Sequence, residues 1–203
     1  LDGRGVKLVV IACNTLTVLG VDTLKGSHAF EIVGMSKGAQ LVLAASSRKK
    51  IGVFATEFTI NSGAHKAAIL AADDGADVYP QACPKFVPLI EGEQFDSAEV
   101  RAAVAEYAAP LKAAGIDTLI LSCTHYPFIQ KEIESEFGSE VTVIDPADAT
   151  AQDTKTVLAA EGLLRSEGAG TLEVCFTADV ERGARIAGRV LPQGKCLFKE
   201  IKL

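Results

Sequence analysis

The sequence predicts an α/β fold with two similar lobes, each built on a mostly parallel sheet flanked by helices, and an active site in the cleft between them. Short apolar runs alternate with longer helix-like stretches along the chain, which predicts the layered class. Several of these runs are apolar almost throughout, as strands covered on both faces are. A third observation, the same ending on two distant strands, predicts the two lobes.

Eight short apolar runs are predicted to be strands, because each is bounded by polar or turn-forming residues. In chain order they are 7–12 (KLVVIA), 30–33 (FEIV), 51–55 (IGVFA), 77–79 (DVY), 118–122 (TLILS), 141–144 (VTVI), 171–176 (TLEVCF) and 197–201 (LFKEI).

The longer stretches between these runs are predicted to be helices. They span 15–25, 37–47, 62–73, 97–113, 127–136, 148–166 and 179–190. Gly75, Gly115 and Gly168 follow three of them, and we interpret these glycines as helix stops.

Composition excludes several classes of protein. Hydrophobic residues make up 48% of the 203 residues and charged residues 23%, which is ordinary for a globular chain and unlike a disordered one. The net charge is −6 and no long Lys/Arg block occurs, so nucleic acid is not an expected partner. No apolar stretch is long enough to span a bilayer, and the first residues lack a signal-peptide pattern, so we expect a cytoplasmic protein without membrane contact.

The five cysteines are spaced irregularly, at 13, 83, 123, 175 and 196. An odd number without close pairing argues against a disulfide framework and for a reducing compartment. The chain has three histidines and no CxxC or HxxxH spacing, so we expect no structural zinc.

Two segments share one pattern. Residues 7–15 (KLVVIACNT) and 117–125 (DTLILSCTH) each run from a polar start through an apolar strand to a cysteine followed by polar residues. Cys13 and Cys123 therefore both stand at the carboxyl end of a predicted strand, where parallel α/β sheets bind their ligands. Two similar lobes, each offering one thiol, would explain the pattern.

Thiols at these positions suit proton transfer. A following helix N-terminus should lower the thiol pKa, and Asn14, Thr15 and Thr124 could hold a carboxylate. If the two thiols faced each other, one thiolate could remove a proton from carbon and the opposing thiol could return one to the other face. Such an inversion needs no cofactor in principle. The alternative, a buried cysteine acting as a small hydrophobic residue, is retained for the other three cysteines.

Four stretches together resemble the glutamate racemase family: ACNT (12–15), IGVFATEFTINSGAH (51–65), QACPKFVPLIEGE (81–93) and CTHYP (123–127). The resemblance implies a cofactor-independent interconversion of L- and D-glutamate that supplies D-glutamate for bacterial peptidoglycan. It implies acid/base roles for Cys13 and Cys123, assisted by His125 and Glu91. It also implies substrate-binding roles for Asn14, Thr15, Thr56 and Thr124.

The resemblance also has departures. The family's opening segment with an Asp-Ser-Gly motif has no counterpart before Cys13, so we expect this chain to lack that portion and, alone, to have little racemase activity. Ser122 replaces a common glycine directly before Cys123. One lobe is expected to span 37–146, and the other to combine 1–36 with 147–203.

Other functions stay open. A racemase of the same superfamily acting on aspartate or another amino acid is one alternative, and a catalytically inert chain acting as a binding or regulatory protein is another. A thiol–disulfide oxidoreductase is less well supported, because the two thiols are 110 positions apart and no CxxC occurs. The expected partner is the small-molecule substrate glutamate, with a homodimer as the expected assembly.

Overall fold

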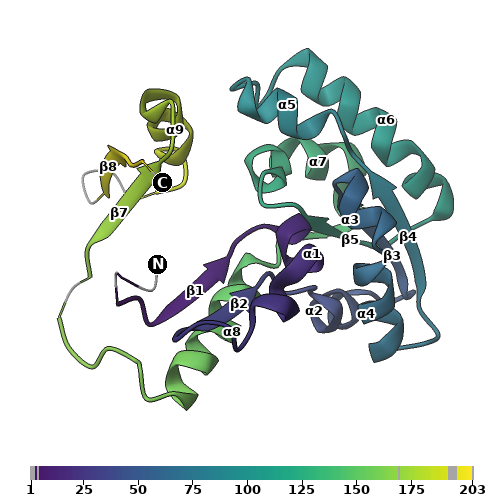
Figure 1. The fold of residues 1–203 in the computed structure, drawn as a ribbon. Coiled ribbons are helices and arrows are strands. Elements are labelled where there is room, and N and C mark those ends of the chain that lie inside the picture. The colour runs from purple at the N-terminus through teal and green to yellow at the C-terminus, as the bar shows by residue number, and fades with distance from the viewer. Residues whose placement is uncertain (1–2, 4, 169, 192–195, 203) are drawn as a thin grey trace. The chain divides into compact units, whose positions relative to one another are not determined.

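The structure is a computed structural model that describes residues 3, 5–168, 170–191 and 196–202 (Figure 1). The chain forms two compact units, Leu1–Leu164 and Arg165–Leu203. The lobe boundaries expected at 36/37 and 146/147 stay a prediction. Within the described residues, no helix combines the length and the apolar character needed to cross a membrane.

The first unit contains two parallel sheets, which confirms the predicted α/β class. The smaller sheet pairs β1 (Leu8–Ile11) with β2 (Glu31–Gly34). The larger sheet has the strand order β4-β3-β5-β6, and its three strand pairs are all parallel. Its strands are β3 (Lys50–Ala55), β4 (Asp77–Ala82), β5 (Thr118–Ser122) and β6 (Thr142–Ile144).

Helices follow the strands in alternation, as predicted. They are α1 (Asn14–Leu24), α2 (Ala39–Ala45), α3 (Glu57–Asn61), α4 (Ala64–Ala72), α5 (Phe86–Glu91), α6 (Ala98–Ala114), α7 (Gln130–Phe137) and α8 (Ala147–Ala160), with 3₁₀ turns η2 (Tyr126–Ile129) and η3 (Gly138–Glu140). The sequence did not predict α3 and α5. Both are too short to show helical periodicity.

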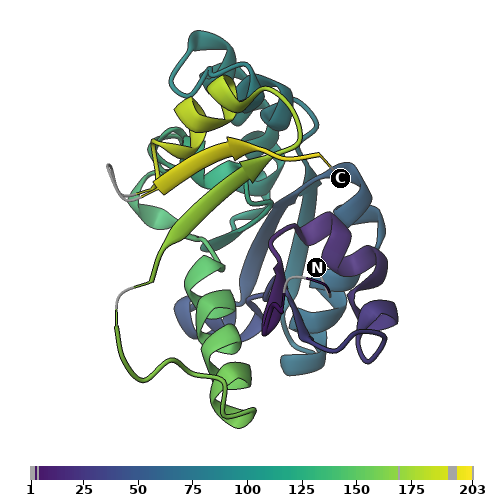
Figure 2. The ribbon, with the colours of Figure 1, turned by 60° about the vertical axis from the view of Figure 1, so that its left-hand side comes forward.

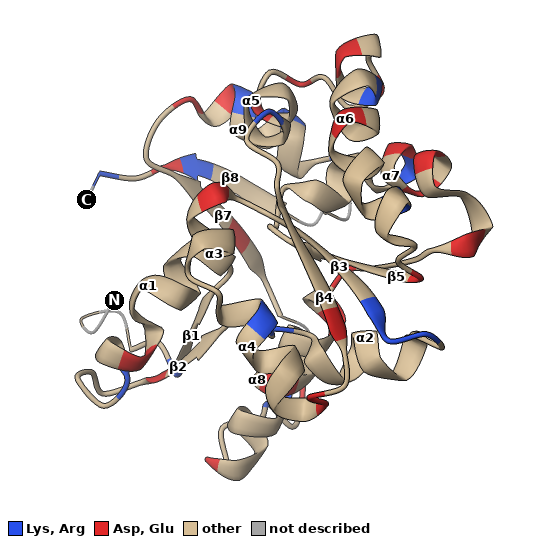
Figure 3. Cartoon of the chain, turned by 90° about the vertical axis from the view of Figure 1, so that its right-hand side faces the viewer, with Lys and Arg blue, Asp and Glu red and all other residues tan. Residues whose placement is uncertain are grey.

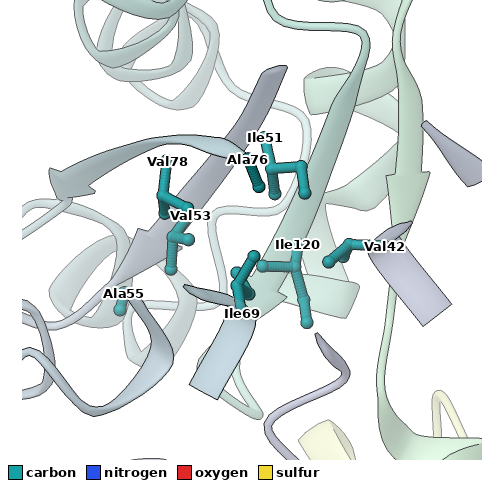
Figure 4. Packing of buried hydrophobic residues seen from close by; sticks show 8 residues of the cluster. All are labelled: Val42, Ile51, Val53, Ala55, Ile69, Ala76, Val78 and Ile120. Atoms are coloured by element: carbon teal, nitrogen blue, oxygen red, sulfur yellow. The ribbon is translucent and has the colours of Figure 1, made fainter. Parts of the chain in front are cut away.

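The larger sheet is covered on both faces, and its central strands β3 and β5 are buried at nearly every position. One face of β3 presents Ile51, Val53 and Ala55, which pack with residues of α2 and α4. Figure 4 shows this cluster, in which Val42, Ile69 and Ile120 meet those side chains. Side chains alternate along a strand, so the intervening positions must be buried by other helices.

The opposite face is closed by aromatic residues. Phe54 of β3 contacts Phe86 of α5 and Phe137 of α7, at ring-centroid distances of 5.8 and 6.0 Å. Phe86 also packs edge-on against Tyr126, which is fully buried. Figure 3 shows charged residues on α5, α6 and α7, the helices that cover this face. One pair of these charges, Lys112 and Glu136, links α6 to α7 at 2.8 Å.

The interpretation of the glycines as helix stops is only partly right. Gly115 follows α6 in a left-handed conformation (φ 72°), as predicted. Gly75 lies three residues beyond α4 and instead donates its N–H to the Asp73 carboxylate. The prediction for Gly168 is wrong, because α8 ends at Ala160 and Gly162 (φ 67°) takes the left-handed position after it.

The second unit is a small β-α-β arrangement. It consists of β7 (Leu172–Phe176), α9 (Val180–Ala187) and β8 (Cys196–Glu200), with the two strands parallel. Figure 2 shows these strands side by side. Phe176 and Phe198 stack on the sheet at a centroid distance of 6.3 Å, and α9 approaches Phe176 at Gly183.

Candidate active site

The carboxyl ends of β1 and β5 border one cavity of about 280 Å³ in the first unit. Seven of the eight predicted site residues line it, and only Glu91 does not. The lining consists of Ala12, Cys13, Asn14, Thr15, Thr56, Val87, Ser122, Cys123, Thr124 and His125. The cavity therefore collects the ends of both strands that carry the repeated pattern.

Cys13 is the residue at which β1 turns into α1. Its backbone is extended (φ −150°, ψ 120°), and its carbonyl accepts the first helical hydrogen bond from Thr17. The first turn of α1 holds no acidic residue, so the partial positive charge of the helix N-terminus is not offset there. Helix α1 thus presents free N–H groups and a thiol at the cavity.

Asn14, the first residue of α1, is 3% exposed, and its Nδ2 atom has no hydrogen-bond partner. A buried amide donor without a partner costs stability, so such a group in a cavity lining points to an acceptor from a bound molecule. The adjacent Thr15 places its hydroxyl in the same lining.

Cys123 follows β5 and is 7% exposed. Burial raises the pKa of its thiol to about 11; the His125 N–H lowers it, the nearby Cys13 raises it further, and the Tyr126 N–H lowers it. The prediction that a following helix N-terminus lowers this pKa is therefore wrong for Cys123. The segment after it is a short 3₁₀ turn, whose N–H groups do not compensate for the loss of water. Cys123 is protonated at neutral pH.

Three threonine hydroxyls form a cluster between α1 and α3. Thr15 Oγ1 lies 2.9 Å from Thr56 Oγ1 and 3.2 Å from Thr59 Oγ1, and Thr56 donates to Thr59 at 3.0 Å. Thr56 also caps α3, because its hydroxyl accepts the Thr59 N–H. Sequence reasoning missed Thr59, which is 1% exposed and lies behind the two lining threonines. The three-residue spacing of Thr56 and Thr59, which is typical of a capped helix start, could have identified Thr59 in the sequence.

A second contact joins the two strand ends directly. The Thr124 hydroxyl donates to the Ala12 carbonyl at 3.3 Å, although the two residues are 112 positions apart. Together with the threonine cluster, this bond ties the segment that carries Cys13 to the sheet that carries Cys123.

His125 and Glu91 form a pair at the edge of the site. His125 Nε2 lies 2.8 Å from Glu91 Oε1, and both side chains are partly exposed. Glu91 is the last residue of α5, so this short helix delivers the carboxylate to the histidine. Val87 of the same helix lines the cavity and was not predicted. The carboxylate can fix the orientation of the imidazole ring.

The other cysteines lie outside the lining. Cys83 is 1% exposed, and burial raises the pKa of its thiol, which fits a structural residue. Cys175 and Cys196 belong to β7 and β8 of the second unit. Among the described residues, no three His, Cys, Asp or Glu side chains are arranged to hold a metal ion.

Comparisons with known proteins agree on one family. The protein family described as Asp/Glu/Hydantoin racemase matches residues 1–154 of this chain. Glutamate racemase from Lysinibacillus sphaericus (strain C3-41) is 37% identical to the chain, and the match covers all of this chain and 77% of that protein. Glutamate racemase from Lactiplantibacillus plantarum is 42% identical over 78% of this chain and 58% of its own.

Solved structures show the same fold. The glutamate racemase isoform RacE1 from Bacillus anthracis superposes with a TM-score of 0.87 at 31% identity, covering 98% of this chain and 74% of that one. The Francisella tularensis glutamate racemase in complex with D-glutamate gives 0.84 at 26% identity, covering 99% and 74%. On these matches, the chain belongs to the Asp/Glu/Hydantoin racemase family.

Proposed function

We propose that this chain interconverts L- and D-glutamate with two thiols as acid and base and without a cofactor, and that the D-glutamate serves peptidoglycan synthesis. The observation that carries the proposal is that Cys13 and Cys123, from separate sheets, line one small cavity beside a buried, unpartnered amide donor. The named relatives, all glutamate racemases, support glutamate as the substrate.

The amino-acid carboxylate is proposed to bind at the start of α1. The N–H groups of this helix end, the Asn14 amide and the Thr15 hydroxyl supply hydrogen-bond donors there. Thr56 and Thr124 supply hydroxyls from the larger sheet. Donors from both sides can thus hold the α-carbon between the two sulfur atoms.

The proton steps balance between the thiols. In one direction the thiolate of Cys13 takes the α-proton, and the C–H electron pair stays on the α-carbon as a carbanion. The protonated Cys123 gives its proton to the opposite face, which leaves the product enantiomer, a Cys13 thiol and a Cys123 thiolate. The high pKa of Cys123 suits the donor role, because the proton is in place when substrate binds. The reverse direction exchanges the two roles.

Exchange of the glutamate α-proton in D₂O tests the proposal, and it can be detected even if the chain racemises glutamate slowly. We expect deuterium to enter glutamate in the presence of the chain, and Cys13→Ser and Cys123→Ser each to lower racemisation by at least about 100-fold, as loss of a general acid or base does. Cys175→Ser, an exposed cysteine outside the cavity, is the matched control. Undiminished exchange in both serine variants at 13 and 123 would reject the two-thiol mechanism.

Two other functions predict different results in the exchange assay and in calorimetry. Deuterium entering aspartate as fast as glutamate would favour an aspartate racemase. Binding of glutamate, measured by calorimetry, with no exchange above the buffer rate would favour a binding protein without catalysis.

A further inference from the structure

We propose that Thr150 is a positioning residue. It forms hydrogen bonds to both chain segments that connect the two sheets of the first unit, and it thereby fixes the position of Cys13 relative to Cys123. The inference rests on the proposed two-thiol function, and its test includes a measurement that needs no turnover.

The chain passes between the two sheets at two places. Residues 35–38 lead from β2 of the smaller sheet to α2 and on into the larger sheet. Asp145 and Pro146 lead from β6 of the larger sheet into α8, which packs against β2. Any change in the angle between the sheets must be absorbed in these two connections.

One hydroxyl binds both connections. Thr150 Oγ1 accepts the Ser36 N–H at 3.0 Å and donates to the Pro146 carbonyl at 3.1 Å. Thr150 is 5% exposed and its bond to Pro146 is buried, whereas its bond to Ser36 is partly buried. The Met35 sulfur lies 3.9 Å from the same oxygen.

The contact with Ser36 distinguishes Thr150 from an ordinary helical threonine. A threonine hydroxyl often bonds the carbonyl four residues earlier, and Thr154 does only that, at 2.8 Å to Thr150 O. Thr150 adds an acceptor contact to a backbone N–H 114 positions away. Replacing its hydroxyl by a methyl group would remove the acceptor of that partly buried N–H.

The space between the connections and the active site is a second cavity, of about 420 Å³. It is lined by Met35 and Thr150 on the connection side and by Ala12 and Thr124 on the active-site side. Because side chains do not fill this space, close packing does not fix the angle between the sheets here. The angle depends instead on hydrogen bonds: from the Ser36 N–H to Thr150, from the Thr124 hydroxyl to Ala12, and within the threonine cluster.

Loss of the Ser36–Thr150 hydrogen bond would therefore move Cys13 relative to Cys123. A misplacement of about 1 Å can cost about 100-fold in rate, even when the change lies far from the chemistry. Binding to the donors at the start of α1 alone should suffer less, since those groups belong to a single element. The expected signature is a loss in kcat that exceeds the change in KM.

The test compares Thr150→Val, Thr150→Ser and the control Thr154→Val, which removes a hydroxyl from the same helix and the same cavity. In Thr150→Val we expect the Ser36 amide to exchange with solvent faster and kcat to fall about tenfold with KM changed less than about twofold. Thr150→Ser should restore both quantities, and Thr154→Val should change neither.

Ser36 exchange is read by NMR in the protein without substrate, so it tests the Ser36–Thr150 hydrogen bond even if the chain has no racemase activity. Unchanged Ser36 exchange in Thr150→Val would overturn the proposal. Faster exchange with kcat equal to that of Thr154→Val would overturn the positioning role. An absence of α-proton exchange in the unmodified chain would instead count against the proposed function.

Discussion

The carboxylate of Glu91 lies outside the cavity and reaches the site only through His125, 2.8 Å away. If it orients the imidazole for proton handling at Cys123, Glu91→Gln should lower kcat by about 10-fold or more, as removal of an orienting carboxylate does. Glu136→Gln, which removes a carboxylate paired with Lys112 between two outer helices, is the matched control. Racemisation followed by circular dichroism measures both, and equal rates would remove Glu91 from the mechanism.

We expect the buried Thr59 hydroxyl to affect substrate binding by orienting the hydroxyls of Thr15 and Thr56. Thr59→Val removes the bonds to Thr15 and Thr56 while keeping the side-chain volume, so the two lining hydroxyls lose their fixed orientation. We expect KM for glutamate to rise about 5- to 10-fold, the loss of about one hydrogen bond, and Thr59→Ser to retain wild-type KM. An unchanged KM in Thr59→Val would show that the cluster serves only the fold.

Motifs at strand ends made most of the candidate site predictable. Cys13 and Cys123 were identified because strand ends of parallel sheets meet at one edge, and polar neighbours such as Asn14 followed from the same argument. Thr59 and Val87 were missed because their place depends on α3 and α5, which the sequence did not reveal. The pKa of Cys123 was predicted with the wrong sign, because burial is a property of the folded chain and not of the local motif.

At the scale of elements, all eight predicted strands are present with ends shifted by at most three residues, because short apolar runs bounded by polar or turn-forming residues are typical of strands. The helices α3 and α5 escaped prediction because, at five and six residues, both are too short to show helical periodicity. Helix α3 follows directly from the cap at Thr56, and α5 carries Pro88 in its first turn, where proline is tolerated although it usually argues against a helix.

The packing of α9 on β7 gives a prediction in which the usual effect of a substitution is reversed. A glycine-to-alanine change inside a helix ordinarily stabilises by about 1 kcal/mol. At Gly183, however, an added Cβ would lie 2.3 Å from the Phe176 ring, which is itself stacked on Phe198. Gly183→Ala should therefore destabilise the second unit by about 1–3 kcal/mol, as overpacking does. Native-state hydrogen exchange in β7 and β8 measures this, with Gly170→Ala, which meets open space, as control.

The turn before β3 depends on Asp117, the residue directly before β5. Its carboxylate accepts hydrogen bonds from the Ser46 hydroxyl, from the N–H and hydroxyl of Ser47, and from the Arg48 N–H. Burial raises the pKa of Asp117, but these hydrogen bonds outweigh it and leave the pKa below its usual value. Asp117→Ala should lower the free energy of unfolding by about 1–3 kcal/mol at pH 7, because the partly exposed donors of Ser46, Ser47 and Arg48 lose a charged acceptor.

The sign of the pH dependence follows from that pKa. A carboxyl whose folded pKa is depressed stabilises the protein above its unfolded pKa of about 4, and the stabilisation is lost as pH falls through the folded value. The stability difference between wild type and Asp117→Ala should therefore shrink below pH 4. A difference that stays constant down to pH 2.5 in urea titrations would contradict the role of the charge.

At the scale of the whole molecule, the hydrogen bonds that join the two sheets of the first unit within the described residues include the threonine cluster, the Thr124–Ala12 bond and the Ser36–Thr150 bond. Each sheet is held by its own helices, whereas the site depends on how the sheets face each other. Global stability and catalytic geometry are therefore separable. Core substitutions in the Val53–Ile120 cluster should lower the melting temperature most, while the hydroxyl deletion Thr150→Val should lower kcat with a smaller loss of melting temperature.

Acid stability of the whole protein should be governed in large part by His65. This side chain of α4 is 3% exposed, and neither ring nitrogen has a hydrogen-bond partner. Burial, with a smaller contribution from the charge of Lys37, lowers its pKa to about 4. The unfolded chain binds the proton at about pH 6.5, so protonation favours unfolding, and stability is lost progressively as pH falls from 6.5 to 4.

The loss attributable to this one histidine approaches about 3 kcal/mol, since each pKa unit is worth about 1.4 kcal/mol. His65→Phe removes the titration, and any packing effect of the larger ring is independent of pH. Unfolding by urea at pH 7 and at pH 4.5 should show wild type losing about 2–3 kcal/mol more than His65→Phe between the two conditions. His28→Gln, at an exposed position, should behave as wild type. Parallel pH curves for wild type and His65→Phe would mean that His65 finds a partner for its proton inside the folded chain.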